Sequence, residues 1–214
     1  MTGDPLQEAI ERAEVLLRET RELLGTEHPQ TLSAMLDVAE ALWAQGRLIA
    51  ARKLEEEVVA GRCRLLGAGN ADTLKAVGKL AVTMAAQGEL AAARELQEEV
   101  VAGMRALDGE TGRDTLRAVN NLAGTVAAQG DLAEARDMLH SVIAAIVREH
   151  GEQHPDCLAA MGNLAGILWQ EGDHAEAYEL QRQVVELHRR VDAGDPSAQT
   201  AAAILEMMER DSGF

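Results

Sequence analysis

The stretch HPDCLAAMGNLAGILWQEGDHAEAYEL (residues 154–180) is matched, with substitutions, by GRDTLRAVNNLAGTVAAQGDLAEARDM, which lies 42 residues earlier (112–138). Two more copies precede these in the same register, and one glycine position recurs in all four copies as Gly46, Gly88, Gly130 and Gly172. A period that holds over four copies without an insertion indicates a repeat protein. In such a protein each unit buries its apolar face only against its neighbours.

Each copy contains two helical patterns separated by glycine. In the first copy, apolar residues recur at three- and four-residue spacing over residues 32–45 and again over 48–66, as on one face of a helix. Gly46 and Gly67 follow these segments, at positions where a helix often ends with a positive φ. We name the first helix of a copy the A helix and the second the B helix.

The same register predicts the organisation of the whole chain. We expect an all-α fold, a right-handed superhelical solenoid of antiparallel helix pairs with about ten helices, in one domain over residues 1–214. One residue is inserted around 192–194, before the last helix. The predicted parts are a B-type helix at 5–24, repeats at about 29–67, 71–109, 113–151 and 155–193, and an A-type helix at 197–210.

Composition narrows the classes of partner. Acidic residues outnumber Lys and Arg by 36 to 20, which gives a formal charge of −16. Nucleic acid is therefore not expected as a partner, because binding it requires a basic surface. An anionic membrane is disfavoured for the same reason, and no apolar run is long enough for a membrane span. With two cysteines and no secretory signal at the N-terminus, we expect a cytoplasmic protein.

The units resemble the 42-residue tetratricopeptide repeats typified by kinesin light chains, which are also common in bacterial signalling proteins. The resemblance covers nearly the whole chain and rests on motifs such as Asn120-Asn121-Leu122-Ala123 and Gly162-Asn163-Leu164-Ala165. It implies that the A helices line a concave groove that holds an extended peptide or a partner helix. It further implies that Asn121 and Asn163 bond the peptide backbone, whereas the first two units carry Asp37 and Lys79 at that position.

The same register selects the residues expected to bind the partner. Lys75, Lys79 and Arg117 would form a basic patch that receives a carboxylate of the partner, or would simply be solvated charges. Trp43 and Trp169 occupy matching positions and are either binding anchors or caps on the next helix. The full expected set is Asp37, Glu40, Trp43, Lys75, Lys79, Arg117, Asn120, Asn121, Asn163, Trp169 and Gln170.

Four glycines lie inside predicted A helices, where each costs roughly 1 kcal/mol relative to alanine. They are Gly78, Gly124, Gly162 and Gly166. Such glycines either allow close helix packing or leave room for a ligand. We favour close packing, because glycine inside a helix often has a packing reason.

No motif for catalysis or cofactor binding is evident, so we predict a non-enzyme without cofactors. The chain has neither a phosphate-binding loop nor the Gly-x-Ser-x-Gly motif of hydrolases. His150, His154 and Cys157 are of the residue types that bind zinc. His154, however, belongs to the His-Pro pair that commonly opens this type of repeat, so we predict no metal site.

These observations predict a scaffold or adaptor that binds a protein or peptide in the groove. Two alternatives remain open. The repeats could serve self-association, with a homodimer formed end to end through the terminal helices, because the last helix carries the apolar residues Ile204, Leu205, Met207 and Met208. They could also be the sensor part of a larger signalling protein of bacterial type.

Overall fold

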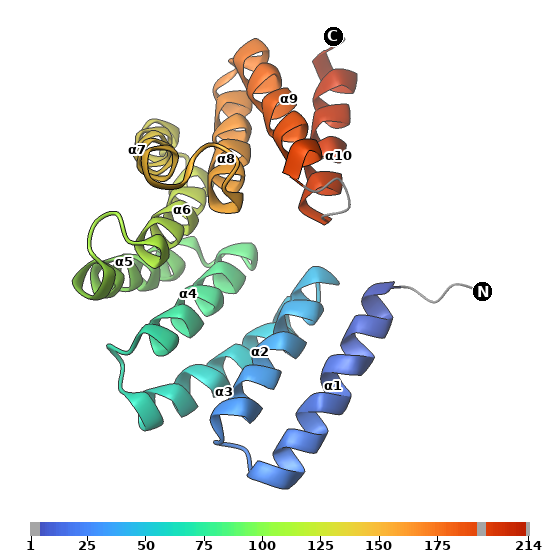
Figure 1. Ribbon diagram of the computed structural model, residues 1–214, viewed down its shortest axis with the longest axis vertical. Coiled ribbons are helices and arrows are strands. Elements are labelled where there is room, and N and C mark those ends of the chain that lie inside the picture. The colour runs from blue at the N-terminus through green and yellow to red at the C-terminus, as the bar shows by residue number, and fades with distance from the viewer. Residues whose placement is uncertain (1–4, 192–195, 213–214) are drawn as a thin grey trace. The chain divides into compact units, whose positions relative to one another are not determined.

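The computed structural model describes residues 5–191 and 196–212, and these residues form ten α-helices and no strand (Figure 1). The predicted all-α fold of helix pairs is therefore confirmed. The inserted residue predicted around 192–194 lies outside the described residues. The helices are α1 (Pro5–Leu24), α2 (Pro29–Ala44), α3 (Leu48–Leu66), α4 (Ala71–Ala86), α5 (Leu90–Asp108), α6 (Arg113–Ala128), α7 (Leu132–His150), α8 (Pro155–Glu171), α9 (His174–Val191) and α10 (Pro196–Ser212).

Three of the A helices, which are the even-numbered ones, begin with side-chain caps. At α2 and α8 a His-Pro pair opens the helix, and the histidine is the N-cap residue. His28 Nδ1 accepts a hydrogen bond from the backbone N–H of Gln30, and His154 Nδ1 accepts one from Asp156. Asn70 caps α4 in the same way. Each contact satisfies one of the N–H groups that the first turn of a helix leaves unpaired.

Glycine ends the helices at regular intervals. Gly46 follows α2 with φ 74° and Gly67 follows α3 with φ 87°. Residues with a side chain are disfavoured at such positive φ values, so glycine here stops each helix and turns the chain back. The same conformation recurs at the glycines that follow the other helices up to α8, which confirms the predicted helix ends.

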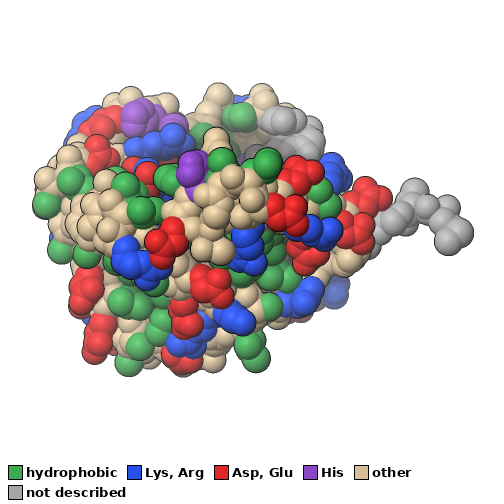
Figure 2. Space-filling model, turned by 90° about the horizontal axis from the view of Figure 1, so that it is seen from below, with side chains coloured by type: hydrophobic (Ala, Val, Ile, Leu, Met, Phe, Trp, Pro, Cys, Tyr) green, Lys and Arg blue, Asp and Glu red, His purple; other side chains and the backbone are tan. Residues whose placement is uncertain are grey.

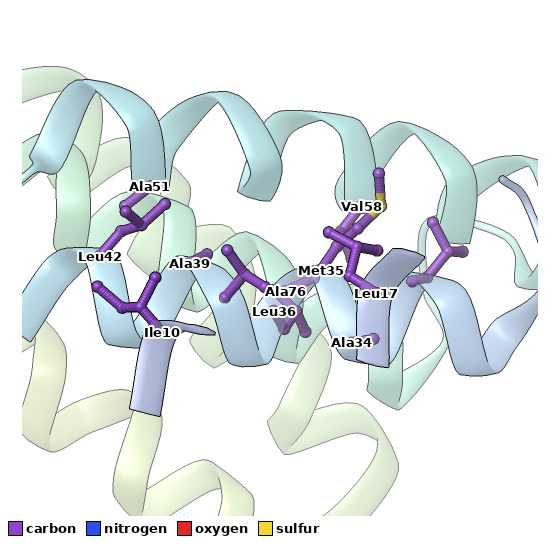
Figure 3. Packing of buried hydrophobic residues seen from close by; sticks show 12 residues of the cluster. Ile10, Leu17, Ala34, Met35, Leu36, Ala39, Leu42, Ala51, Val58 and Ala76 are labelled. Carbon is purple, nitrogen blue, oxygen red and sulfur yellow. The ribbon is translucent and has the colours of Figure 1, made fainter. Parts of the chain in front are cut away.

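The chain forms two compact units, Met1–Leu107 and Asp108–Phe214. In the first unit, α1, α2, α3 and α4 pack consecutively, and Ala93 of α5 packs against Leu80 and Met84 of α4. Figure 3 shows the central cluster, in which Ile10 and Leu17 of α1 meet the buried side of α2 and residues of α3. Small side chains such as Ala39 and Ala51 are at most 1% exposed and let these helices approach closely.

In the second unit, α6 to α10 pack consecutively, and the A helices α6 and α8 also touch each other. Every second-unit B helix has a fully enclosed alanine and valine at fixed register: Ala135 and Val142 on α7, and Ala177 and Val184 on α9. Most charged side chains lie at the surface, and acidic and basic side chains are interspersed over the face shown in Figure 2. In the second unit, the A helices α6 and α8 therefore have one buried side and one exposed face.

Candidate functional site: the exposed faces of the A helices

In the first unit the exposed side chains of α2 and α4 include both acidic and basic groups. Asp37 and Glu40 lie on α2, and Lys75 and Lys79 lie on α4, all of them exposed. Lys79 Nζ lies 2.8 Å from Glu40 Oε2 in an ion pair with both side chains about half-exposed or more. Such exposed pairs contribute little stability, but this one neutralises a lysine of the predicted basic patch.

Arg117, the third member of that predicted patch, belongs to the second unit and is also paired. The carboxylate of Asp156, in the first turn of α8, lies 2.9 Å from Arg113 Nε and 3.3 Å from Arg117 Nε. Asp156 is only 16% exposed, whereas both arginine side chains are more than half exposed. Two guanidinium groups thus share the Asp156 carboxylate, and Asp114 in the first turn of α6 also interacts electrostatically with Arg113. The hydrogen bond to Asp156 raises the pKa of Arg113, so its charge is fixed.

The asparagines of the second unit link the two A helices. Asn163 Nδ2 of α8 donates a hydrogen bond of 3.1 Å to Asn120 Oδ1 of α6. Asn121, one residue further along α6, is exposed. The sequence register matched Asn163 with Asn121, but in the folded unit Asn120 is its hydrogen-bond partner. Asn121 therefore presents its amide to solvent.

A small cavity of about 170 Å³ lies beside these asparagines. Its mouth carries Arg117, Asn120, Asn121 and Asp156, and the apolar residues Val142 and Ile146 of α7 contribute to its lining, together with Leu116 and Ala159. A cavity of this size can admit one aliphatic side chain but no drug-sized ligand. No sequence signal points to this cavity, because Val142 and Ile146 come from the intervening B helix.

The expectation that the A-helix glycines serve close packing is wrong for three of the four. A Cβ built on Gly124, Gly162 or Gly166 would have no neighbouring atom within 4 Å. On Gly78 it would lie 3.8 Å from a Val100 methyl group, an ordinary contact. The second unit therefore has glycines on an open helix face, where they lower helix stability without a packing benefit.

Close packing instead involves two glycines of the B helices, Gly61 and Gly103, for which no role was expected. A Cβ on Gly61 would lie 2.9 Å from a methyl carbon of Leu32, and one on Gly103 would lie 2.6 Å from a methyl carbon of Leu74. Each leucine lies in the first turn of the A helix that belongs to the same repeat as the glycine. The only sequence signal was that the two glycines share one register position, 42 residues apart.

The two tryptophans differ in their surroundings. Trp169 is half-buried and packs edge-on against His174 at the start of α9, with ring centroids 4.3 Å apart. Trp43 is 42% exposed at the end of α2. Gln170, next to Trp169, is exposed. Trp169 thus contacts the next helix as a cap would, while Trp43 keeps a large apolar surface open to solvent.

The residues considered for zinc binding are arranged differently from a metal site. The rings of His150 and His154 stack with centroids 4.9 Å apart, and His154 caps α8. Cys157 is fully buried, and burial raises the pKa of its thiol to about 11, so the thiolate that metals require is disfavoured. Within 5–191 and 196–212, no three His, Cys, Asp or Glu residues are grouped so that they could hold a metal ion.

No helix in this part of the chain could span a membrane.

Two family models described as tetratricopeptide repeat match the chain. One matches residues 31–72, and the other matches 72–144 and 114–190. The chain therefore belongs to the tetratricopeptide repeat family, whose repeats generally form non-catalytic scaffolds for protein–protein interaction. No curated protein sequence matches the chain.

Solved structures place the chain among kinesin-light-chain-like repeat proteins. A kinesin-light-chain-like protein of Podosopora anserina with nearly identical TPR-like repeats is 30% identical, with a TM-score of 0.62 over 87% of this chain and 89% of that one. BtubC (BKLC) from P. vanneervenii is 18% identical, with a TM-score of 0.70 over 98% of this chain and 85% of that one. A Rap protein complexed with Competence and Sporulation Factor is 13% identical, with a TM-score of 0.70 over 95% and 60%. The last two likenesses concern the fold alone.

Proposed function

We propose that the chain is an adaptor that binds an extended segment of a partner protein along the exposed face of α6 and α8. This proposal rests on the charge of the exposed residues of that face. Every exposed residue of the two helices is cationic or uncharged, although the chain as a whole has a charge of −16. These residues are Arg113, Arg117, Asn121, Gly124, Ala128, Pro155, Ala159, Asn163 and Gln170.

The chemistry of the face suggests how such a segment would be held. Arg113 and Arg117 would attract a carboxylate of the partner, since both guanidinium groups are more than half exposed and share the carboxylate of Asp156. Asn121 would bond the peptide backbone, and the 170 Å³ cavity beside it would take an aliphatic side chain. Over Gly162 and Gly166 the backbone could approach α8 closely, because no side chain intervenes.

The proposal is tested by filling the open face without disturbing the fold. In Gly162→Gln/Gly166→Gln, the new side chains extend from positions with free space, and glutamine favours a helix more than glycine does. We expect a partner captured from the source lysate by the wild type to be lost with this variant. The matched control is Ala60→Gln/Ala102→Gln, which adds the same side chains at exposed positions of the B helices α3 and α5. Equal capture by all three proteins would contradict the proposal.

A further inference from the structure

The turn between α2 and α3 differs from the three equivalent turns of the chain in a concerted way. Arg47, Ile49 and Lys53 are all exposed there. At the same register the other turns have an acidic residue, an alanine and another acidic residue. These are Glu89, Ala91 and Glu95, then Asp131, Ala133 and Asp137, and finally Asp173, Ala175 and Glu179. The first turn thus has two positive charges and a large apolar side chain where every other turn has two negative charges and a methyl group.

The repeats provide an internal comparison for this departure. Ile49 is 84% exposed, and the alanines at its position in the other repeats are exposed as well, so the position faces solvent in each of them. Single exposed apolar residues are common on protein surfaces. Here, however, the apolar residue is flanked by two charge reversals in a chain with a charge of −16. Repeats 2 to 4 also show that the fold itself does not require any of the three residues.

The three side chains border an open depression of about 920 Å³, which we name the Arg47 surface. One wall is fixed by Arg52, whose Nη1 donates hydrogen bonds to Gln87 Oε1 at 2.9 Å and to Glu89 Oε1 at 2.6 Å. These bonds tie the first turn of α3 to the α4–α5 turn. By contrast, neither Arg47 nor Lys53 has an ion pair in the described part of the chain. The remaining lining residues are Gly46, Leu48, Ala50, Gln87 and Glu89, and the carboxylate of Glu89 is already paired with Arg52.

We propose that the Arg47 surface is a second docking site, separate from the α6–α8 face, for an acidic segment of a partner protein that carries an aliphatic side chain. Carboxylates of that segment pair with Arg47 and Lys53, and its aliphatic group covers Ile49. The acidic remainder of the chain does not prevent this pairing. Exposed charges further away than about 8 Å are largely screened at physiological ionic strength.

The test uses the full chain and a fluorescein-labelled peptide of repeated Leu-Glu-Glu, with a Leu-Lys-Lys peptide for comparison. The variant Arg47→Glu/Ile49→Ala/Lys53→Glu takes the residues of the second repeat, so it should fold, which circular dichroism checks. We expect this variant to bind the Leu-Glu-Glu peptide roughly tenfold or more weakly than the wild type by fluorescence anisotropy. The wild-type affinity should fall with added salt, and the Leu-Lys-Lys peptide should not compete.

Building the same three residues on another turn of the chain gives a second, independent test. Adding Asp173→Arg, Ala175→Ile and Glu179→Lys to the folded triple variant should restore binding, because it rebuilds the same three residues on the α8–α9 turn. Equal binding by wild type and triple variant would overturn the proposal. Two further outcomes would also overturn it. One is a concentration-dependent mass that the triple variant abolishes, which would assign the surface to a second copy of the chain. The other is sedimentation with phosphatidylserine vesicles that the triple variant abolishes, which would assign the Arg47 surface to membrane binding.

Discussion

Glycine inside the helices of this protein occurs in two environments with opposite consequences. Gly61 and Gly103 lie against leucine side chains of their own repeat, so a side chain there would have to displace the packing. Gly162 and Gly166 face open space. At the first pair glycine is explained by packing, whereas at the second pair it lowers helix stability without a structural gain.

This difference predicts the effect of alanine substitutions. Gly162→Ala and Gly166→Ala should each increase the free energy of unfolding by roughly 1 kcal/mol, because alanine restricts the unfolded chain and meets nothing in the fold. Gly103→Ala should gain less or lose stability, since its Cβ would lie 2.6 Å from a methyl carbon of Leu74. Urea unfolding of the three variants measures this. Equal gains at all three positions would show that the Gly103 contact imposes no constraint.

A buried carboxyl group makes stability depend on pH. Glu55 of α3 is 4% exposed, and its Oε2 has no hydrogen-bond partner among the described residues. Burial raises the pKa of Glu55 above 4.5. The folded chain therefore keeps this proton at pH values where the unfolded chain has lost it. The group stabilises the fold below pH 4.5, and this contribution disappears as pH rises through the folded-state pKa.

We therefore expect Glu55→Gln to stabilise the chain at pH 7 by about 1 kcal/mol. Glutamine already occupies the same register position as Gln97 and Gln181, so the substitution fits the fold. The gain should vanish at pH 4, where Glu55 is protonated. Glu57→Gln is the matched control, because it removes the same charge from an exposed position of α3. If both variants shifted the urea midpoint equally at pH 7, burial would not be the cause.

At the scale of the helices, the first turn of a B helix is bonded to the end of the next A helix. Arg52 of α3 bonds Gln87 and Glu89, which follow α4, and also Glu56 on its own helix. Arg136 of α7 bonds Glu171 at the end of α8 with a distance of 2.7 Å. These arginine side chains are only about a third exposed, so they hold neighbouring repeats together more effectively than fully solvated pairs do.

Arg52→Ala should accordingly lower the free energy of unfolding measurably, because it removes hydrogen bonds between repeats. Arg182→Ala serves as the control. Arg182 pairs with Glu179 three residues away on the same helix, and both side chains are more than half exposed. Such a solvated pair contributes little stability, so Arg182→Ala should change the free energy of unfolding less than Arg52→Ala. Thermal unfolding measures the stability of both variants. An equal loss of stability in the two variants would contradict this reasoning.

At the scale of the whole molecule, the terminal helices determine whether copies of the chain could stack. Leu16 of α1 is 46% exposed, although the residues at its register position in later B helices, such as Val58, are buried. No A helix covers this side of α1 in the described chain. The positions beside Leu16 hold Arg12 and Glu19, where α3 has Leu54 and Gly61. Stacking another helix there would bury these charges, which is unfavourable unless they are paired.

End-to-end pairing through the terminal helices thus has a specific obstacle, even though Ile204 and Met207 of α10 are exposed. We expect the wild type to sediment as a monomer of 22.9 kDa at both low and high protein concentration. Arg12→Leu/Glu19→Ala should promote association by giving α1 the apolar character of the later B helices. A concentration-dependent mass for the wild type that this variant left unchanged would favour self-association through another surface.

The sequence by itself determined the repeat, the helical class and the helix ends. These features are encoded locally, by apolar spacing within each helix and by glycines such as Gly46 that adopt a positive φ at the turns. It also identified the family, because the motifs recur at fixed spacing. The expected binding residues all lie on A helices, but sequence register could not decide which of them would be paired. Whether the residues form one domain or a continuous groove stays a prediction.

Only the tertiary structure decided which side chains meet. Asn163 bonds Asn120 rather than its register match Asn121, and Lys79 pairs with Glu40 from the preceding repeat. The open space over Gly166 and the close contact at Gly103 likewise depend on neighbours from other helices. The physical reason is that helix formation follows from interactions within a few residues. Hydrogen bonds, ion pairs and cavities between repeats depend instead on atoms about 40 residues apart, whose distances are set only when the helices pack.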